Sequence, residues 1–580
     1  MADIGEIPIE GGGESEEEGN FFLKTGHIVM LSMICLFILS ASLIEHIHFG
    51  YIHETGVVIL IGISISLIAK FGGYSEMNQI LEFNDNIFFY VWLPPLVFAS
   101  GYNMKRKKFF QHFNYIALFG ILGTFAWFIL FSLFTAIIFF ITPMLKYNPA
   151  TGESGYFQCT IREILLLSSL MCSSDVVAAV SLIDYRKQAK LFSICFGEGI
   201  TNDAVSIILF NAVFKYTGGS EHFTGNTIFK ISYEFANLTF YSILAGIIAS
   251  FTWALLLKHF RFLTHSPIHE TLFVFWFGYI GYMVAEVFEL SGIITLLSSG
   301  IIMSHYAWYN LSPQSKQTTS IAFGWMGFWS EAFIFAYLGL TFFSYSSYDW
   351  SWQFLIAEFI VVFVGRFLGV VGLLYAISII FNHKREVTFK EAIFLFCGGM
   401  IRGAIAFGLV LRLDKHLPNR SVIVTTSLWL VLATTLIFGT LLPFLSKILL
   451  SPSSEPAKED EMKELENVGD DNKSNSEGES QSEESFHDLL IHPNFDAGSQ
   501  TVASGKKKKR RFGCVHYFKK FDEVILRPVL IYKYSKERNE KEYEIYEEMK
   551  HQGISVEDVF SERNDMMKKH ENKAGNLMQH

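Results

Sequence analysis

The chain has 580 residues, of which 51% are hydrophobic and 18% charged, and its formal net charge is −10. The charged residues gather in the C-terminal part, after a long and mainly apolar stretch, which excludes a single soluble domain and predicts a membrane domain followed by a soluble tail. The 6 cysteines are scattered, which argues against a disulfide framework or a cysteine-based metal site.

Apolar runs long enough to cross about 30 Å of hydrocarbon follow one another along the chain. The fold class is therefore predicted to be an all-α polytopic membrane protein with about 13 transmembrane helices. Residues 1–22 lack the positively charged region of a signal peptide and are predicted to be a disordered acidic N-terminus, and 23–450 to be the transmembrane domain. The predicted spans lie at 23–45, 53–70, 85–103, 113–142, 161–184, 189–215, 231–257, 269–288, 291–307, 321–344, 351–381, 389–412 and 421–450.

Short loops rich in Lys and Arg indicate the orientation, because such loops stay on the cytoplasmic side. Threading thirteen spans places the C-terminal tail on the same side as four basic loops, at 105–108, 186–190, 258–261 and 384–390. This side is predicted to be cytoplasmic, with the N-terminus on the opposite side. Arg412, Lys415 and Arg420 run against the rule.

The tail divides into two predicted parts. Residues 451–505 are predicted to be a disordered acidic linker, because a segment so rich in Ser, Glu, Asp and Asn cannot bury enough apolar surface to fold. Residues 506–580 are predicted to be a cytoplasmic regulatory tail with helices. Its polybasic cluster is expected to attract anionic lipid at roughly 1 kcal/mol per residue, a solvated charge run being the alternative. The cluster consists of Lys506, Lys507, Lys508, Lys509, Arg510 and Arg511.

Polar and acidic residues interrupt two neighbouring apolar runs. Glu198, Asn202 and Asp203 lie in one run, and Ser174 and Asp175 lie in the run before it. A carboxylate at mid-membrane costs roughly 2.5–3.5 kcal/mol even on lenient insertion scales, so these acids predict a water-accessible cation site. Glu198 and Asn202 share a helix face while Asp203 is turned about 100° further, so Asp203 can face a pathway and Glu198 a neighbouring span. A salt bridge within the bundle is the alternative reading, and for Glu198 the preferred one.

Two arginines also lie inside apolar runs. Arg366 and Arg402 are each expected to face a carboxylate or exposed helix-end carbonyls, because an unpaired guanidinium would be very costly there. Gly-rich sequence around Arg402, and the polar residues around Asp175, predict broken helices, which secondary transporters place in corresponding spans of two inverted halves.

Three further acids lie at membrane depth or near it. Glu331 is interpreted as lining a pathway or capping a structural element. Glu286 and Glu289 lie at a span end and are interpreted as interfacial caps.

The segment Gly197–Ser206 closely resembles the ion-binding helix of the eukaryotic sodium/proton exchanger family, and other stretches agree with that family in the same order. Those at 289–306 and 331–335 resemble most closely its plant vacuolar and endosomal branches. The resemblance covers roughly residues 25–450 and a short tail segment. The other matching stretches are Leu93–Gly101, Glu289–Thr295, Met303–Tyr306, Glu331–Phe335, Met400–Ala404 and Phe521–Pro528.

This resemblance implies a sodium/proton antiporter-like fold with broken helices at the ion site. It implies that Asp203 carries a proton and a cation, Na⁺ or K⁺, in alternation, with Asn202 beside it. Asp175 and Ser174 would complete the cation site. The family usually has Thr-Asp-Pro or Thr-Asp-Ser at this point, whereas the present chain has Ser174-Asp175-Val176 and so lacks a helix breaker.

The resemblance further implies that Arg366 pairs with Glu198, that the chain forms a homodimer, and that an endosomal, vacuolar or other organelle membrane is favoured over the plasma membrane. The expected function is electroneutral exchange of a monovalent cation for H⁺, because Asn202 is neutral and only one carboxylate of the pair changes its charge. An acid-lined cation channel and a transport-dead membrane sensor are the alternatives. Neither an enzyme activity, a cofactor nor a nucleic-acid partner is expected.

Overall fold

A computed structural model describes residues 12–47, 53–71, 87–104, 109, 112–149, 151–183, 185–217, 225–375, 387–450, 521–532 and 534. Each predicted apolar run coincides with one helix or with consecutive helical segments, which confirms the predicted helical fold class. Within the described residues, 7 helices are long and apolar enough to cross a membrane. The total of thirteen spans stays a prediction.

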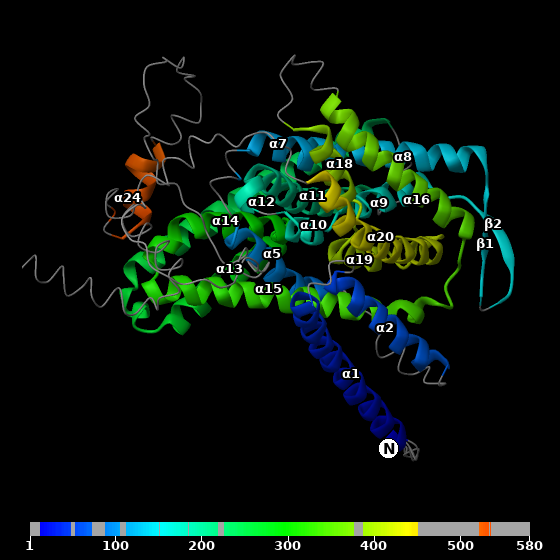
Figure 1. Cartoon of the computed structure of the whole chain (residues 1–580), viewed down its shortest axis with the longest axis horizontal. Helices are drawn as coiled ribbons and strands as arrows, with labels where there is room; N and C mark the ends of the chain where they lie inside the picture. Colours follow the sequence, from blue (N-terminus) through cyan, green and yellow to red (C-terminus); the bar gives the residue numbers. More distant parts are fainter. Residues whose placement is uncertain are drawn as a thin grey trace, which may run out of the picture.

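The helices form two groups that pack mainly among themselves (Figure 1). We call the first group the scaffold bundle. It contains α1 (Gly12–Ile47), α2 (Glu54–Phe71), the π-helix η1 (Phe88–Trp92), α5 (Leu93–Tyr102), α12 (Gly225–His259), α13 (Pro267–Val287), α14 (Gly292–Asn310) and α15 (Pro313–Thr341). The short 3₁₀ helices η3 (Arg261–His265) and η4 (Phe342–Tyr345) follow α12 and α15.

The second group is called the core bundle here. It contains α7 (Phe113–Ala117), the π-helix η2 (Leu118–Gly123), α8 (Thr124–Ile141), α9 (Ile161–Leu170), α10 (Val177–Ser181), α11 (Tyr185–Thr217), α16 (Trp352–Phe367), the π-helix η5 (Leu368–Gly372), α18 (Phe389–Gly398), α19 (Ala404–Leu411) and α20 (Arg420–Leu449). Helix α11 departs from helical geometry at Gln188, where φ is −131°.

Three features differ from the sequence-based expectation or add to it. Helix α1 begins at Gly12, so it extends into the acidic segment predicted to be disordered. The connection between α8 and α9 forms an antiparallel hairpin of β1 (Met144–Tyr147) and β2 (Ser154–Phe157), in which Met144 pairs with Phe157. In the tail, the π-helix η6 (Asp522–Leu526) continues into α24 (Arg527–Leu530), the orange segment beside α12 and α14 in Figure 1.

The two broken helices begin in the same way. Thr160 caps α9 and Thr388 caps α18, and in each a glutamate three residues later completes a capping box. Each capped half-helix runs for 10 residues before the chain unwinds. This parallel fits the expectation that the two broken helices are corresponding parts of inverted halves.

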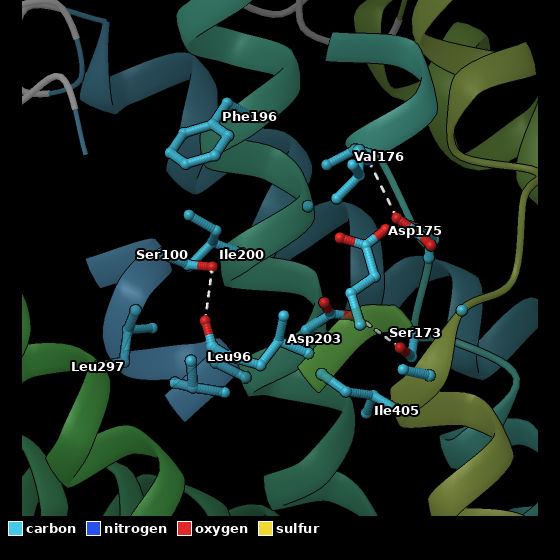
Figure 2. A pocket seen from close by; sticks show the side chains of 18 of the residues that line it. Leu96, Ser100, Ser173, Asp175, Val176, Phe196, Ile200, Asp203, Leu297 and Ile405 are labelled. Carbon is cyan, nitrogen blue, oxygen red and sulfur yellow. Dashed lines mark hydrogen bonds between the residues drawn. The ribbon is translucent and has the colours of Figure 1, made fainter. Parts of the chain in front are cut away.

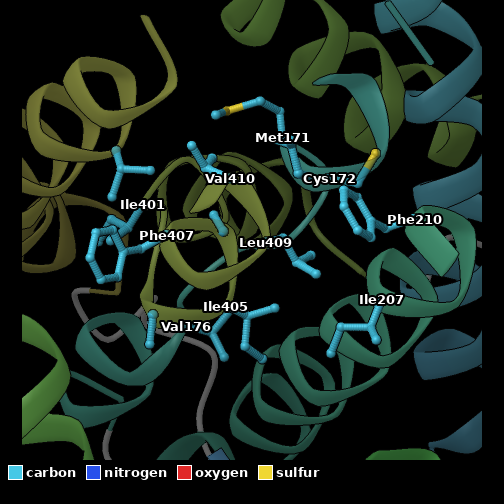
Figure 3. Close-up of a cluster of buried hydrophobic side chains, with 14 of the residues drawn as sticks. Met171, Cys172, Val176, Ile207, Phe210, Ile401, Ile405, Phe407, Leu409 and Val410 are labelled. Atoms are coloured by element: carbon cyan, nitrogen blue, oxygen red, sulfur yellow. The ribbon is translucent and has the colours of Figure 1, made fainter. Parts of the chain in front are cut away.

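An apolar cluster holds the broken helices against α11 (Figure 3). Met171 and Val176 flank the first break, and they belong to one cluster with Phe210 of α11 and Phe407 of α19. Gly199 of α11 lies so close to Val176 that a Cβ atom would collide with the valine side chain. Small residues permit such close approach, and the resulting van der Waals packing is one of the forces that hold helices together inside a bilayer.

Candidate functional site

The two unwound segments meet at the centre of the core bundle. The first lies between α9 and α10 at residues 171–176, and the second between α18 and α19 at 399–403. The backbone N–H of Asp175 donates to the carbonyl of Ile401 at 2.8 Å, so each break satisfies a backbone group of the other. The chain therefore unwinds at this point, although Val176 is not a helix breaker.

Asp203 and Asp175 face a common cavity of about 110 Å³ (Figure 2). Ser173 Oγ donates to Asp203 Oδ1 at 2.5 Å, and the backbone N–H of Val177 donates to Asp175 Oδ1 at 3.0 Å. Both aspartates keep intermediate exposure, whereas the residues around them are mostly buried. The structure therefore brings together the two carboxylates predicted to bind the cation, and both can be reached from the cavity.

Asn202 is fully buried and connects three elements. Its Nδ2 donates to Ser174 Oγ at 2.8 Å, and its Oδ1 accepts from Thr124 Oγ1 of α8 at 3.0 Å. The amide thus joins α11 to the first break and to α8. Asn202 and Ser174 thus lie beside the two aspartates and hydrogen-bond to each other, and Ser174 also lines the cavity.

Glu198 and Arg366 form an ion pair away from the cavity. Arg366 Nη2 donates to Glu198 Oε1 at 2.5 Å, and Arg366 is 3% and Glu198 2% exposed. A buried pair of this kind contributes little net stability, but removing one partner leaves an unpaired buried charge. Glu198 thus joins α11 to α16, while Asp203 on the same helix faces the cavity.

Arg402 contacts the first break through its guanidinium. Its Nη1 donates to the backbone carbonyl of Ser173 at 2.6 Å. Arg402 was predicted to face either a carboxylate or helix-end carbonyls, and the structure shows a carbonyl. The Trp127 ring lies close to both arginines, 4.2 Å from Arg402 Cζ and 5.3 Å from Arg366 Cζ. A cation near the end of α9 is favourable because the helix dipole is negative there.

Glu331 supplies an acid from the scaffold bundle. It lies on α15, is 9% exposed, and lines the same cavity as Asp203 and Asp175. The side chains predicted to bind the cation at Asp203 and Asp175 thus come from the core bundle, while Leu96, Leu297 and Glu331 of the scaffold bundle form the facing wall. The predicted lipid-binding cluster, 506–511, lies outside the described residues.

The arrangement suits transient binding of a monovalent cation. Three carboxyl groups line the cavity, whereas the buried arginines Arg366 and Arg402 do not line it and bind Glu198 and a backbone carbonyl. Negative charge in such a site needs a proton or a cation to balance it, because an unpaired charge in a low-dielectric interior is costly. Within the described ranges, no group of three or more His, Cys, Asp or Glu side chains could hold a metal ion.

Three contact residues were not predicted from the sequence. Ser173 bonds to Asp203, Thr124 bonds to Asn202, and Trp127 lies against both arginines. For Ser173, the polar neighbours Ser174 and Asp175 weakly indicated a place in the site. Thr124 and Trp127 lie in an ordinary apolar run, where nothing marks a residue that reaches a partner far along the chain.

Comparison with known proteins gives consistent results. Residues 21–448 match the family described as "Sodium/hydrogen exchanger, transmembrane". Sodium/hydrogen exchanger 4 of Arabidopsis thaliana is 29% identical over 523 residues, covering 86% of this chain and 93% of the relative. Sodium/hydrogen exchanger 8 of Homo sapiens is 29% identical over 445 residues, covering 75% of this chain and 73% of the relative.

The fold is also similar to a solved structure. The sodium proton antiporter MjNhaP1 from Methanocaldococcus jannaschii superimposes with a TM-score of 0.54 at 14% identity, covering 74% of this chain and 100% of that one. At this identity the likeness shows the fold alone.

Proposed function

The chain belongs to the sodium/hydrogen exchanger family, and from this premise we propose that it exchanges Na⁺ or K⁺ for a proton by alternating access, with Asp203 as the carrier carboxylate. The observation that carries the proposal is the position of Asp203. Its carboxylate lines a cavity between the two bundles, receives a hydrogen bond from Ser173, and forms no ion pair with a basic residue of the described ranges.

Coupling arises from mutual exclusion at Asp203. The carboxylate binds either a proton or a cation, because both neutralise the same charge in a cavity of limited volume. Asn202 contributes an amide and no charge, and its two hydrogen bonds support a purely positioning role. One charge therefore crosses in each direction, and the exchange is electroneutral. Asp175 and Ser174 supply further oxygen ligands for the cation.

Alternating access is supported by the origin of the cavity walls. The ligand-bearing side chains belong to the core bundle, and residues such as Leu297 and Glu331 belong to the scaffold bundle. Movement of one bundle against the other changes which side of the membrane reaches Asp203. The Glu198–Arg366 pair and the Asp175–Ile401 hydrogen bond keep the ion site together during that movement.

The experiment is a flux assay on the purified full chain in sealed lipid vesicles. An imposed Na⁺ or K⁺ gradient should drive saturable proton movement that does not change when a membrane voltage is applied, and choline should drive none. A voltage-dependent current would instead identify a channel. If the protein is folded but no cation drives proton movement, the result would favour the alternative of a membrane sensor that does not transport. Comparing Na⁺ with K⁺ in the same vesicles determines the preferred cation.

The cellular arrangement is part of the proposal. The chain is proposed to form a homodimer in an endosomal, vacuolar or other organelle membrane, with its tail in the cytoplasm. The resemblance of the motifs at 289–306 and 331–335 to the organellar branches supports this placement. Imaging of the tagged chain, with antibody access to the tail before and after permeabilisation, tests membrane and orientation. Cross-linking in native membranes tests the dimer.

The polybasic cluster, 506–511, is proposed to bind anionic lipid on the cytoplasmic leaflet and to modulate turnover. Its charge supports this role, and attraction of this kind should weaken as salt shortens the Debye length below about 8 Å. Replacing the six basic residues with Gln should change the transport rate in vesicles with anionic lipid and leave the cation preference unchanged. An identical rate with and without anionic lipid would contradict this role.

A further inference from the structure

A second cavity lies on the other side of Ile293 from the ion site. Ile293 of α14 lines both the ion-site cavity and a separate cavity of about 100 Å³. We call the second one the outer cavity. Asn211 lines it and lies 8 residues beyond Asp203 on α11, about 12 Å along the helix. One buried isoleucine, 6% exposed, thus lies between two polar spaces along the same pair of helices.

The outer cavity carries opposite charges from the two bundles. Arg412, at the end of α19 in the core bundle, lines it together with Glu286, near the end of α13 in the scaffold bundle. The two charges thus line one cavity from opposite bundles, and among the described residues no carboxylate forms an ion pair with Arg412. The Arg412 guanidinium lies over the Phe89 ring of the scaffold bundle, 4.8 Å from its centroid.

The polar groups of the outer cavity are held in place. Glu286 Oε1 accepts from the backbone N–H of Gly292 at 3.0 Å, and a Cβ atom on Gly292 would lie 2.7 Å from the same oxygen. Tyr282 Oη donates to the Phe89 carbonyl at 2.9 Å. Ser291 is 2% exposed, and its Oγ has no hydrogen-bond partner among the described residues. A buried polar atom without a protein partner is commonly satisfied by a water molecule or an ion.

Helix α14 places the outer cavity opposite the docked tail segment. Its N-terminal end, at Ser291 and Ile293, borders the outer cavity, and Leu297 borders the ion-site cavity. Its C-terminal end contacts the tail through Asn310, whose Nδ2 donates to the Leu530 carbonyl at 2.8 Å. From Ser291 to Asn310 the helix rises about 28 Å, close to the thickness of a bilayer's hydrocarbon. The outer cavity and the tail therefore lie at opposite membrane faces.

We propose that the outer cavity is the pathway entrance on the face opposite the tail, and that Arg412 acts there as a tethered cation. Its guanidinium competes with the transported cation for the negative field of Glu286, and so lowers the apparent affinity for cation on that face alone. This inference rests on the proposed exchange function. It gives a role to Arg412, a basic residue on the side where few are expected.

The test uses the full chain in vesicles sorted by orientation, with Na⁺ as the probe. Na⁺-driven proton flux is measured while Na⁺ is varied on the outer-cavity face or on the tail face. For Arg412→Gln, we expect the KM for Na⁺ on the outer-cavity face to fall roughly 2- to 30-fold, the range for unit charges about 8 Å apart at dielectric constants from about 80 to 20. The KM on the tail face should change less than twofold. Arg412→Lys should behave like wild type.

Lys415→Gln is the matched control, because Lys415 is an exposed cation in the same loop and does not line the cavity. An unchanged outer-face KM in Arg412→Gln, a parallel change on both faces, or the same change in Lys415→Gln would overturn the inference. If Arg412→Gln fails to fold, Glu286→Gln tests the other charge. Its KM for Na⁺ on the outer-cavity face should rise, and an unchanged KM would overturn the inference. Wild-type vesicles in which neither Na⁺ nor K⁺ drives proton flux would instead refute the exchange function itself.

Discussion

At the scale of single residues, the two acids of α11, Glu198 and Asp203, differ in the partners that they contact. Glu198 is buried against Arg366, whereas Asp203 lines the cavity and accepts a hydrogen bond from Ser173. The first acid belongs to the packing of the core bundle and the second to the cavity. Substitutions that break the Glu198 pair should therefore lower stability, whereas substitutions at Asp203 should lower transport.

Asp203→Asn should abolish cation-driven proton flux and leave the fold intact. The amide oxygen can still accept from Ser173, and the substitution removes only the charge that balances a proton or a cation. Flux in vesicles measures the loss, and the thermal unfolding midpoint of the purified protein measures the fold. Asp414→Asn, on an aspartate paired with Arg162 at 3.3 Å far along the chain, is the control and should transport normally. Normal flux from Asp203→Asn would remove Asp203 from the carrier role.

Arg366→Ala should destabilise the chain by about 3–5 kcal/mol, because it leaves Glu198 charged and buried without its partner. Glu198→Gln added to Arg366→Ala should restore part of that stability, since the unpaired charge is then gone. Unfolding midpoints of the two single variants and the double variant form the cycle that measures the coupling. A double variant no more stable than Arg366→Ala would show that the geometry of this pair does not govern stability.

The residues of the site could be predicted only where the sequence itself is unusual. Asp203, Asp175 and Arg366 are noticeable because charge in an apolar run is rare. Thr124 and Trp127 reach Asn202 and the arginines from an apolar stretch in which threonine and tryptophan are ordinary. Their contacts are made by the crossing of helices, which no local pattern encodes.

At the scale of elements, hydropathy predicted where helices lie, while the breaks were predicted from the polar residues around Asp175 and the Gly-rich sequence around Arg402. The bounds of the first break could not be read from the run at 161–184, in which α9 ends at Leu170 and α10 begins at Val177. The break is stabilised by partners from elsewhere, namely the Arg402 side chain and the Ile401 carbonyl. Tertiary contacts thus compensate for the missing helix breaker. The π-helices η1, η2 and η5 likewise had no signal in the apolar pattern.

The second break is expected to be intolerant of added volume at Gly399. A Cβ atom there would collide with the guanidinium of Arg366, so Gly399→Ala should displace Arg366 from Glu198. The cost of such overpacking is about 1–3 kcal/mol, measurable as a lower unfolding midpoint. Gly439→Ala is the control, because nothing lies within 4 Å of its added Cβ atom in α20. It should be neutral or stabilising by up to about 1 kcal/mol. Equal midpoints for the two variants would contradict the expectation.

At the scale of the whole molecule, the tail segment joins the C-terminal end to the scaffold bundle. Asp522 is at the centre of this contact, accepting from Tyr306 Oη at 2.6 Å and from Arg527 Nε at 2.9 Å. Lys258 Nζ donates to the Pro528 and Val529 carbonyls at the end of α12. The segment thus connects α12 and α14 at the membrane face away from the outer cavity.

Burial raises the pKa of Asp522, but hydrogen bonds from His305 and Tyr306 and the charges of His305 and Arg527 outweigh it and hold the pKa at about 2, below the ordinary 3.8. A lowered carboxyl pKa stabilises the docked state above the ordinary value, and this contribution disappears as pH falls through the lowered value. The contribution of the Asp522 carboxylate to docking should therefore disappear as it becomes protonated, between about pH 4 and pH 2.

Asp522→Asn should release the tail segment at neutral pH. Hydrogen exchange followed by mass spectrometry should show faster exchange at 521–532 and no change in α20. Asp414→Asn is the control, because it removes an aspartate that has no contact with the tail. Protection of the segment that survives Asp522→Asn would contradict this account.

The ion-site cavity exists only where two separately packed bundles face each other. Its two aspartates belong to the core bundle, and Leu96, Leu297 and Glu331 of the facing wall belong to the scaffold bundle. In the proposed mechanism, substitutions of the apolar wall residues should alter how fast one bundle moves against the other, while the aspartates proposed to bind the cation stay unchanged. Selection could therefore change the speed of this protein without retuning which ion it recognises.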